Sequence, residues 1–251
     1  MTNAGPDRDT QLGGERRDFP STCWSRFVGA FEGEGGASAL EELASRYWKP
    51  IYAYIRMQRA KSNEDAKDLT QEFFAWVIES GFISRADPDR GRFRAFVKVA
   101  LKHFLSKDER DARAQRRGGG RRIVSIDSAA GALPPVDVAD PAGRTPEEVL
   151  DEAWKNEVLT SAQRILEQEL LRDGQEVASK IFRDYYLGDS DGLNYREVAA
   201  RHGVDESDVL NHLRNGRKRY REILKRLVAE TVGGEADLLE EWRSLFGEAR
   251  E

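Results

Sequence analysis

The chain has 251 residues, a formal net charge of −5, and 39% hydrophobic and 34% charged side chains. This length favours two small domains over one large domain, and the apolar content suffices for helical bundles. No apolar run reaches the roughly 18 residues of a membrane span, and the polar start does not resemble a signal peptide, so we expect a cytoplasmic protein without membrane contact. The lone Cys23 excludes an internal disulfide framework.

The charges are segregated along the sequence. Residues 92–122 hold eleven Lys or Arg against three acids, and residues 214–226 hold seven against one. Acids gather instead in residues 64–72, 147–157 and 230–251. Such segregation predicts several surfaces with different partners, among them two basic surfaces suited to nucleic acid.

The first part of the chain predicts a disordered start followed by three helices. Residues 1–18 lack hydrophobic periodicity, which predicts disorder. Apolar residues spaced by three and four predict helices over 37–59 and 63–80. In the second of these, an acidic stripe faces away from the apolar face. A third helix over 93–117 combines an apolar stripe, which includes Phe93, Phe96 and Phe104 as core residues, with a cationic back.

A linker separates these helices from the rest of the chain. Residues 119–145 are rich in Pro and Gly, which predicts an extended segment and a domain boundary. Thr145 and Pro146 then begin a helix that reaches residue 171, and another helix covers 175–187. With no strand alternation, the predicted fold is all-α, with two helical domains over 19–118 and 146–232 joined by the linker.

The sharpest local signal is a helix-turn-helix in residues 194–226. Its first helix runs from Tyr195 to His202, Gly203 suits a left-handed C-cap, and Asp205 is expected to cap the second helix. The spacing packs Val198 and Ala199 against Val209 and Leu213, leaving polar residues outward: Ser207, Asp208, Asn211, His212, Asn215 and Lys218. A helical hairpin with a solvated, charged second helix is the alternative interpretation.

The last segment, 233–251, predicts one more amphipathic helix. Its apolar residues recur at helical spacing: Leu238, Leu239, Trp242, Leu245 and Phe246. We expect this helix to pack against the helix-turn-helix domain, and a site for an inhibitory or activating partner is the alternative.

The order of these parts resembles sigma-70-family factors of RNA polymerase, of the small extracytoplasmic-function type that retains only regions two and four. The resemblance rests on DAKDLTQEFFAWV, on FRAFVKVALKHFLSKDERDARAQRR and on the terminal RKRYREILKR, and it covers roughly residues 19–232. It implies a sigma factor that binds core RNA polymerase and directs promoter-specific initiation. Region two would be 19–118 and region four 146–232.

The resemblance also implies positions for the contacts. The acidic helix would bind the clamp helices of the largest catalytic subunit, through Asp65, Asp68, Gln71 and Glu72. The minus-ten DNA would contact residues of the next loop and of the cationic helix: Phe82, Arg85, Arg90, Arg92, Arg94, Lys98, Lys102, Arg113 and Arg116. Positive and stacking groups suit single-stranded DNA. The polymerase flap region would be a further partner.

In region four, the second helix of the helix-turn-helix would read the minus-thirty-five element. The matching residues are Ser207, Asp208, Asn211, His212, Asn215, Arg217, Lys218 and Arg219. Two residues depart from the family pattern: Gly216 is expected to loosen that helix by about 1 kcal/mol, and Lys67 reduces the acidity of the docking helix. Phosphorylation of Thr70 by a Ser/Thr kinase would restore that charge, and control by an anti-sigma factor stays open.

Two other classes of protein compete with this interpretation. A stand-alone helix-turn-helix regulator would bind duplex DNA without polymerase, but it gives no reason for the acidic docking motif. A metal-dependent enzyme would need Glu64, Asp65, Asp68 and Glu72 as ligands, and no phosphate-binding glycine loop, catalytic histidine or second acidic cluster accompanies them. We therefore expect no enzyme activity, no cofactor and no metal.

Overall fold

The computed structural model describes residues 36–59, 62–82, 91–117, 143–187 and 194–247. Within these ranges the chain forms eight helices and no strand, apart from an isolated bridge between Arg92 and Val232. The all-α prediction is confirmed for this part of the chain. The predictions for residues 1–18 and for 119–142 of the linker lie outside the described residues.

The helices of the first half agree with the predicted ranges to within a residue. They are α2 (Gly36–Arg59), α3 (Asn63–Glu79) and α4 (Phe93–Arg117). At the start of α3, the hydroxyl of Ser62 accepts a hydrogen bond of 3.1 Å from the backbone N–H of Asp65. Such a cap satisfies one of the free donors of a helix start.

The second half holds the remaining helices: α5 (Pro146–Arg172), α6 (Glu176–Leu187), α7 (Tyr195–His202), α8 (Glu206–Ala229) and α9 (Glu235–Phe246). The start of α5 is fixed by a capping box. There the Glu148 N–H donates to the Thr145 hydroxyl at 3.3 Å, and the Thr145 N–H donates to the Glu148 carboxylate at 2.6 Å. The predicted start at Thr145 and Pro146 is confirmed.

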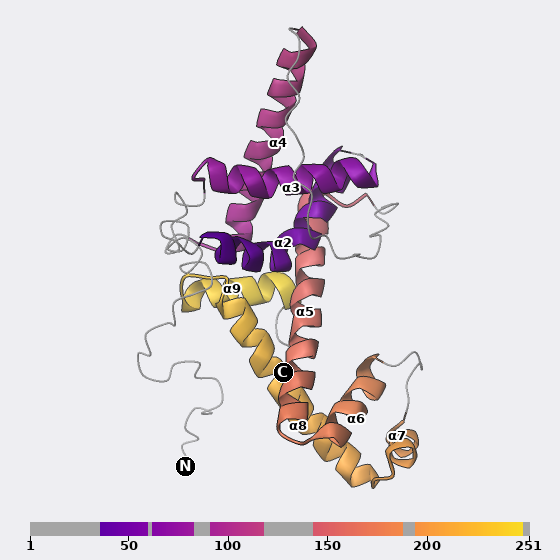
Figure 1. Ribbon diagram of the computed structural model, residues 1–251. Coiled ribbons are helices and arrows are strands. Elements are labelled where there is room, and N and C mark those ends of the chain that lie inside the picture. Colours follow the sequence, from indigo (N-terminus) through magenta and orange to yellow (C-terminus); the bar gives the residue numbers. More distant parts are fainter. Residues whose placement is uncertain (1–35, 60–61, 83–90, 118–142, 188–193, 248–251) are drawn as a thin grey trace, which may run out of the picture.

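Helix α5 connects the two halves of the molecule. It has 27 residues, which corresponds to about 40 Å at 1.5 Å per residue. It packs most extensively against α2 near one end and against α8 and α6 towards the other (Figure 1). The buried residues of both halves belong to one hydrophobic cluster. The predicted split into two separate domains is therefore not seen in the packing.

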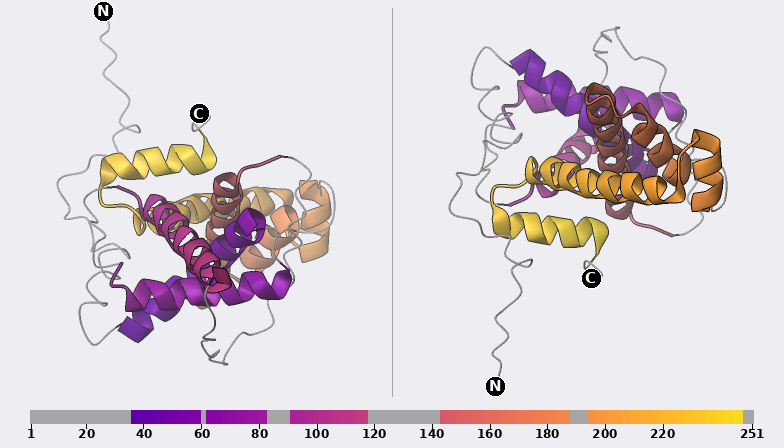
Figure 2. Two further views of the ribbon diagram at one scale, coloured as in Figure 1. Left: turned by 90° about the horizontal axis from the view of Figure 1, so that it is seen from above. Right: turned by 90° about the horizontal axis from the view of Figure 1, so that it is seen from below.

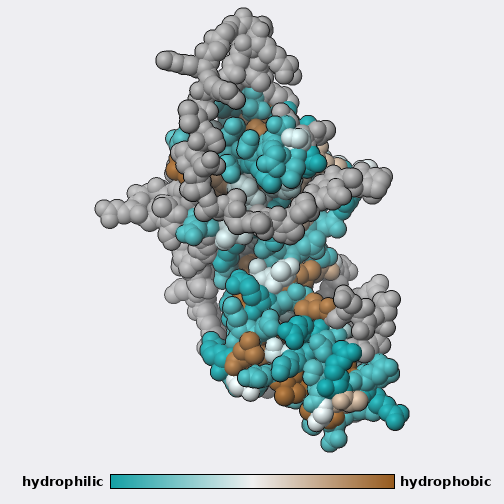
Figure 3. Space-filling view, turned by 45° about the vertical axis from the view of Figure 1, so that its right-hand side comes forward, coloured by the Kyte–Doolittle hydropathy of each residue, from teal (hydrophilic) through white to brown (hydrophobic). Residues whose placement is uncertain are grey.

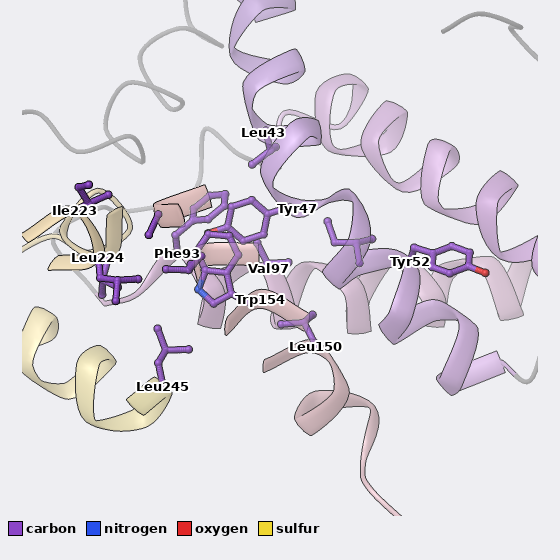
Figure 4. Packing of buried hydrophobic residues seen from close by; sticks show 14 of the residues in the cluster. Leu43, Tyr47, Tyr52, Phe93, Val97, Leu150, Trp154, Ile223, Leu224 and Leu245 are labelled. Atoms are coloured by element: carbon purple, nitrogen blue, oxygen red, sulfur yellow. The ribbon is translucent and has the colours of Figure 1, made fainter. Parts of the chain in front are cut away.

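Aromatic residues hold the junction of α2 and α5. The rings of Tyr47 and Trp154 stack with centroids 4.4 Å apart, and Phe93 meets Tyr47 edge-on at 4.9 Å. Leu224 of α8 and Leu245 of α9 lie close to this group (Figure 4). Because large buried aromatic side chains dominate the energetics of a core, this group contributes strongly to joining α2, α4 and α5.

Helix α9 lies alongside α8 and also contacts α5 (Figure 2). The prediction that the last segment is an amphipathic helix packed on the helix-turn-helix half is confirmed. None of the helices in the described residues has the length and apolar character required to cross a membrane.

Candidate nucleic-acid interface

The turn between α7 and α8 has the geometry of a helix-turn-helix. Asn194 and Glu197 form a capping box at the start of α7, and Gly203 ends it with φ of 65°, in the left-handed region that favours glycine. Asp205 occupies the N-cap position of α8, but its side chain makes no capping hydrogen bond. The predicted boundaries are therefore confirmed, while the predicted capping by Asp205 is wrong.

The predicted contact across this turn is present. Val198, Val209 and Leu213 have no exposed surface, and Ala199 is 5% exposed. Val204, in the turn, is only half-buried and packs against the same cluster. The orientation of α8 is thus fixed by its apolar face, and its opposite face is turned to solvent.

Most of the residues predicted to contact the minus-thirty-five element lie on that solvent-facing side. Six of them are exposed: Ser207, Asp208, Asn211, Asn215, Arg217 and Lys218. Amide side chains can read base edges, and the cations can bind phosphates. On the face drawn in Figure 3, the described surface is mostly hydrophilic, with scattered apolar side chains.

Two of the predicted contact residues are less accessible. Arg219 is half-buried and donates a hydrogen bond of 2.8 Å to Asp173, just after α5. His212 is half-buried and lines a pocket of about 490 Å³ beside the start of α6, together with Asn215 and Gly216. Arg219 and His212 are therefore less available for contacts with a partner than the six exposed residues.

Gly216 has a packing role that the sequence did not indicate. It is buried, and a Cβ atom added there would lie 2.6 Å from Cδ2 of Phe182 on α6. The absence of a side chain therefore allows α6 and α8 to approach closely. The loss of helix propensity at Gly216 is therefore accompanied by a close helix–helix contact that a larger residue would prevent.

The cationic surface of α4 is paired with carboxylates of the second half. Arg94 is 4% exposed, and its guanidinium donates to Glu241 of α9 through Nε at 2.8 Å and Nη2 at 2.9 Å. It also forms an ion pair with Asp151 of α5. Burial lowers the pKa of Arg94, but the hydrogen bonds and charges of Glu241 and Asp151 outweigh it and leave the pKa above its ordinary value. In this conformation Arg94 is not accessible to DNA.

The neighbouring cations of α4 are paired as well. Lys98 lies 2.6 Å from a carboxylate oxygen of Asp151, and Lys102 lies 2.7 Å from Glu147. The hydrogen bond from Lys102 lowers the pKa of Glu147. Arg92, directly before α4, contacts Glu240 at 3.1 Å and Glu241 at 3.4 Å. All of the predicted minus-ten cations with described side chains thus have an acidic partner within the chain.

Phe82 lies in a partly exposed aromatic group. Its ring centroid is 4.9 Å from that of Trp76, 5.3 Å from Phe96 and 5.8 Å from His103. Phe96 is half-buried, whereas Phe93 and Phe104 are in the core, as predicted. Arg85 and Arg90 lie outside the described residues, as do the side chains of Arg113 and Arg116 at the end of α4.

The predicted polymerase-docking residues form an exposed stripe on α3, defined by Asp65, Asp68, Gln71 and Glu72. Lys67 forms an ion pair with Glu64, with 3.1 Å between Nζ and Oε1. Thr70 has no exposed surface, and its hydroxyl donates a hydrogen bond of 2.7 Å to the Ala66 carbonyl. The predicted phosphorylation of Thr70 is therefore wrong for the folded protein, because a kinase could not reach this hydroxyl.

Glu241, Asp151 and Glu147 were not predicted as site residues. The only sequence signal was their membership of acidic segments, which does not tell which cation each one meets. Among the described residues, no group of His, Cys, Asp or Glu side chains is arranged to hold a metal ion. The chain matches no family model, no curated protein and no solved structure.

Proposed function

We propose that the protein is a sigma factor, which binds core RNA polymerase and directs it to promoters. One observation carries this proposal: a single chain carries a helix-turn-helix with an exposed polar and basic face and, on α3, an exposed acidic stripe. A stand-alone DNA-binding regulator would account for the first feature only.

The stripe on α3 suits a protein partner. Asp65, Asp68 and Glu72 are exposed carboxylates on a helix whose other face is anchored by the buried Leu69, Phe73 and Val77. The helix is therefore held rigidly while its charges face solvent. Charge complementarity of this kind sets the rate and specificity of association.

The two candidate DNA-binding surfaces lie at opposite ends of the molecule. Helix α4 is at one end of α5, and the turn between α7 and α8 is at the other (Figure 1). This separation supports contacts with two distinct promoter elements, with α8 on the distal duplex and α4 near the melted one. Salt-sensitive binding to phosphates is expected from Arg217 and Lys218.

The test is formation of a stable complex with core RNA polymerase from the same host. Wild type is compared with an Asp65→Lys, Asp68→Lys variant, and the control variant is Glu152→Lys, Glu167→Lys, which makes the same charge change at exposed carboxylates of α5. We expect wild type and control to bind and the α3 variant to lose binding.

Each outcome has a direct meaning. If all variants bind equally, the stripe on α3 is not the docking surface. If wild type does not bind polymerase but does bind duplex DNA, the sigma proposal fails and a stand-alone helix-turn-helix regulator is the better interpretation.

A further inference from the structure

The cationic face of α4 is covered by two acidic elements of the same chain. The first turns of α5 supply Glu147 and Asp151, and α9 supplies Glu240 and Glu241. We call these four carboxylates the acidic cover. They meet the cations that the proposed function assigns to minus-ten DNA: Arg92, Arg94, Lys98 and Lys102.

The centre of the cover is a buried ion pair. Glu241 has no exposed surface, and Arg94 is 4% exposed and makes a third hydrogen bond, of 2.9 Å, to the Ser244 hydroxyl. Buried ion pairs of this kind add little stability compared with apolar residues of the same volume, and their best-attested use is to specify one arrangement among several. A guanidinium that donates two hydrogen bonds to a carboxylate in this geometry can donate to a phosphate in the same way.

Helix α9 is short, and its N-terminus has no side-chain cap. It has 12 residues, and its N-cap residue is Gly234, which has no side chain with which to form a capping hydrogen bond. Its inner side carries the buried Glu241 and Leu245. Leu239, on its outer side, is 40% exposed. Short helices without packing are marginal in water, so α9 depends on its contacts with α4, α5 and α8.

We propose that α9, latched by Glu241 on Arg94, is an autoinhibitory cover that must leave before Arg92 and Arg94 can bind nucleic acid. This inference rests on the proposed function for the identity of the DNA-binding face. It does not rest on polymerase binding. In the covered state Glu240 and Glu241 of α9 pair with Arg92 and Arg94. Departure of α9 would exchange these carboxylate partners for phosphate partners, while Lys98 and Lys102 keep their partners on α5.

The test uses the full chain and compares wild type with Glu241→Gln and with the control variant Glu235→Gln. Glutamine keeps the size of the Glu241 side chain but removes its charge. Glu235 is an exposed carboxylate of the same helix and is not one of the four carboxylates of the acidic cover. Two quantities are measured: amide hydrogen exchange in residues 235–246, and affinity for a labelled single-stranded DNA oligonucleotide at fixed salt.

We expect Glu241→Gln to speed exchange in residues 235–246 and to raise the affinity for single-stranded DNA about tenfold, since apparent affinity scales with the fraction of open molecules. Glu235→Gln should stay within about twofold of wild type in both measurements. Adding Arg92→Gln to the Glu241→Gln variant should reverse most of the gain, because Arg92 is one of the two cations that α9 covers.

Three results would overturn the proposal. One is release of α9 in Glu241→Gln without a gain in DNA affinity, and another is unchanged exchange in residues 235–246. The third is absence of single-stranded DNA binding in every variant. If Glu241→Gln does not fold, Ser244→Ala decides, because it removes the hydrogen bond of 2.9 Å from Arg94 to α9 and leaves both charges of the ion pair in place. If Glu241→Gln gains DNA affinity but the protein does not bind polymerase, the proposal that α9 is a cover stands and the sigma proposal fails.

Discussion

Replacing Trp154 by alanine tests whether the two halves share one core. The residue lies on α5, is 3% exposed and stacks on Tyr47 of α2. Losing a buried indole removes its transfer free energy and leaves a cavity, which costs about 3–5 kcal/mol. Because this side chain joins the halves, Trp154→Ala should lower the stability of the whole described structure and not of one half.

The assay is urea denaturation followed by circular dichroism at 222 nm. Wild type should unfold in one transition, and Trp154→Ala should shift its midpoint without dividing it. Tyr186→Ala is the control, because Tyr186 is 43% exposed and its loss should cost much less. Two separate transitions in wild type, or a loss below about 1 kcal/mol in Trp154→Ala, would refute the reasoning.

A double-mutant cycle refines this prediction. Stacked aromatic pairs contribute about 0.5–1.5 kcal/mol beyond the area they bury, so Tyr47→Ala and Trp154→Ala should show a coupling energy of that size. The indole Nε1 of Trp154 is buried and has no hydrogen-bond partner among the described residues. Trp154→Phe, which removes this donor, should therefore cost clearly less than Trp154→Ala.

The remaining predictions concern a close contact, a cap and an ionisation. Gly216→Leu should lower the free energy of unfolding by about 1–3 kcal/mol, because the leucine side chain would clash with Phe182. An unchanged urea midpoint would contradict this contact. Asn194→Ala should cost about 1 kcal/mol through loss of the α7 cap, measured by thermal unfolding against Glu222→Ala on the exposed side of α8. Burial, with a smaller effect from Glu147, raises the pKa of Tyr54 to about 12. Above the ordinary pKa of about 10 the unfolded chain ionises first, so stability should fall between pH 10 and 12, and less in Tyr54→Phe; equal pH profiles of the two proteins would count against this.

Helix positions could be read from the sequence because they depend on local interactions. The spacing of apolar residues placed α3 and α4 correctly, and the caps at Thr145 and Gly203 fixed the starts and ends of their helices. Capping hydrogen bonds and backbone conformation involve residues only a few positions apart. The helix-turn-helix and the exposure of most of its polar face followed from the same local pattern.

Other properties depended on which helix faces meet in space. The sequence did not indicate that Thr70 is buried or that Gly216 lies against Phe182. Nor did it show that Arg94 pairs with Glu241, a residue 147 positions away. In each case the residue type is compatible with several environments, and only the packing of helices distant in sequence selects one.

The sequence by itself thus determined the all-helical class, the helix boundaries and the acidic and basic segments that motivate the sigma proposal. The tertiary structure decided that both halves pack into one hydrophobic cluster and that the cations of α4 are covered by acids of α5 and α9. The physical reason is range: helix formation is set by interactions within a few residues, whereas burial and ion pairing are set by the sum of contacts over the whole chain.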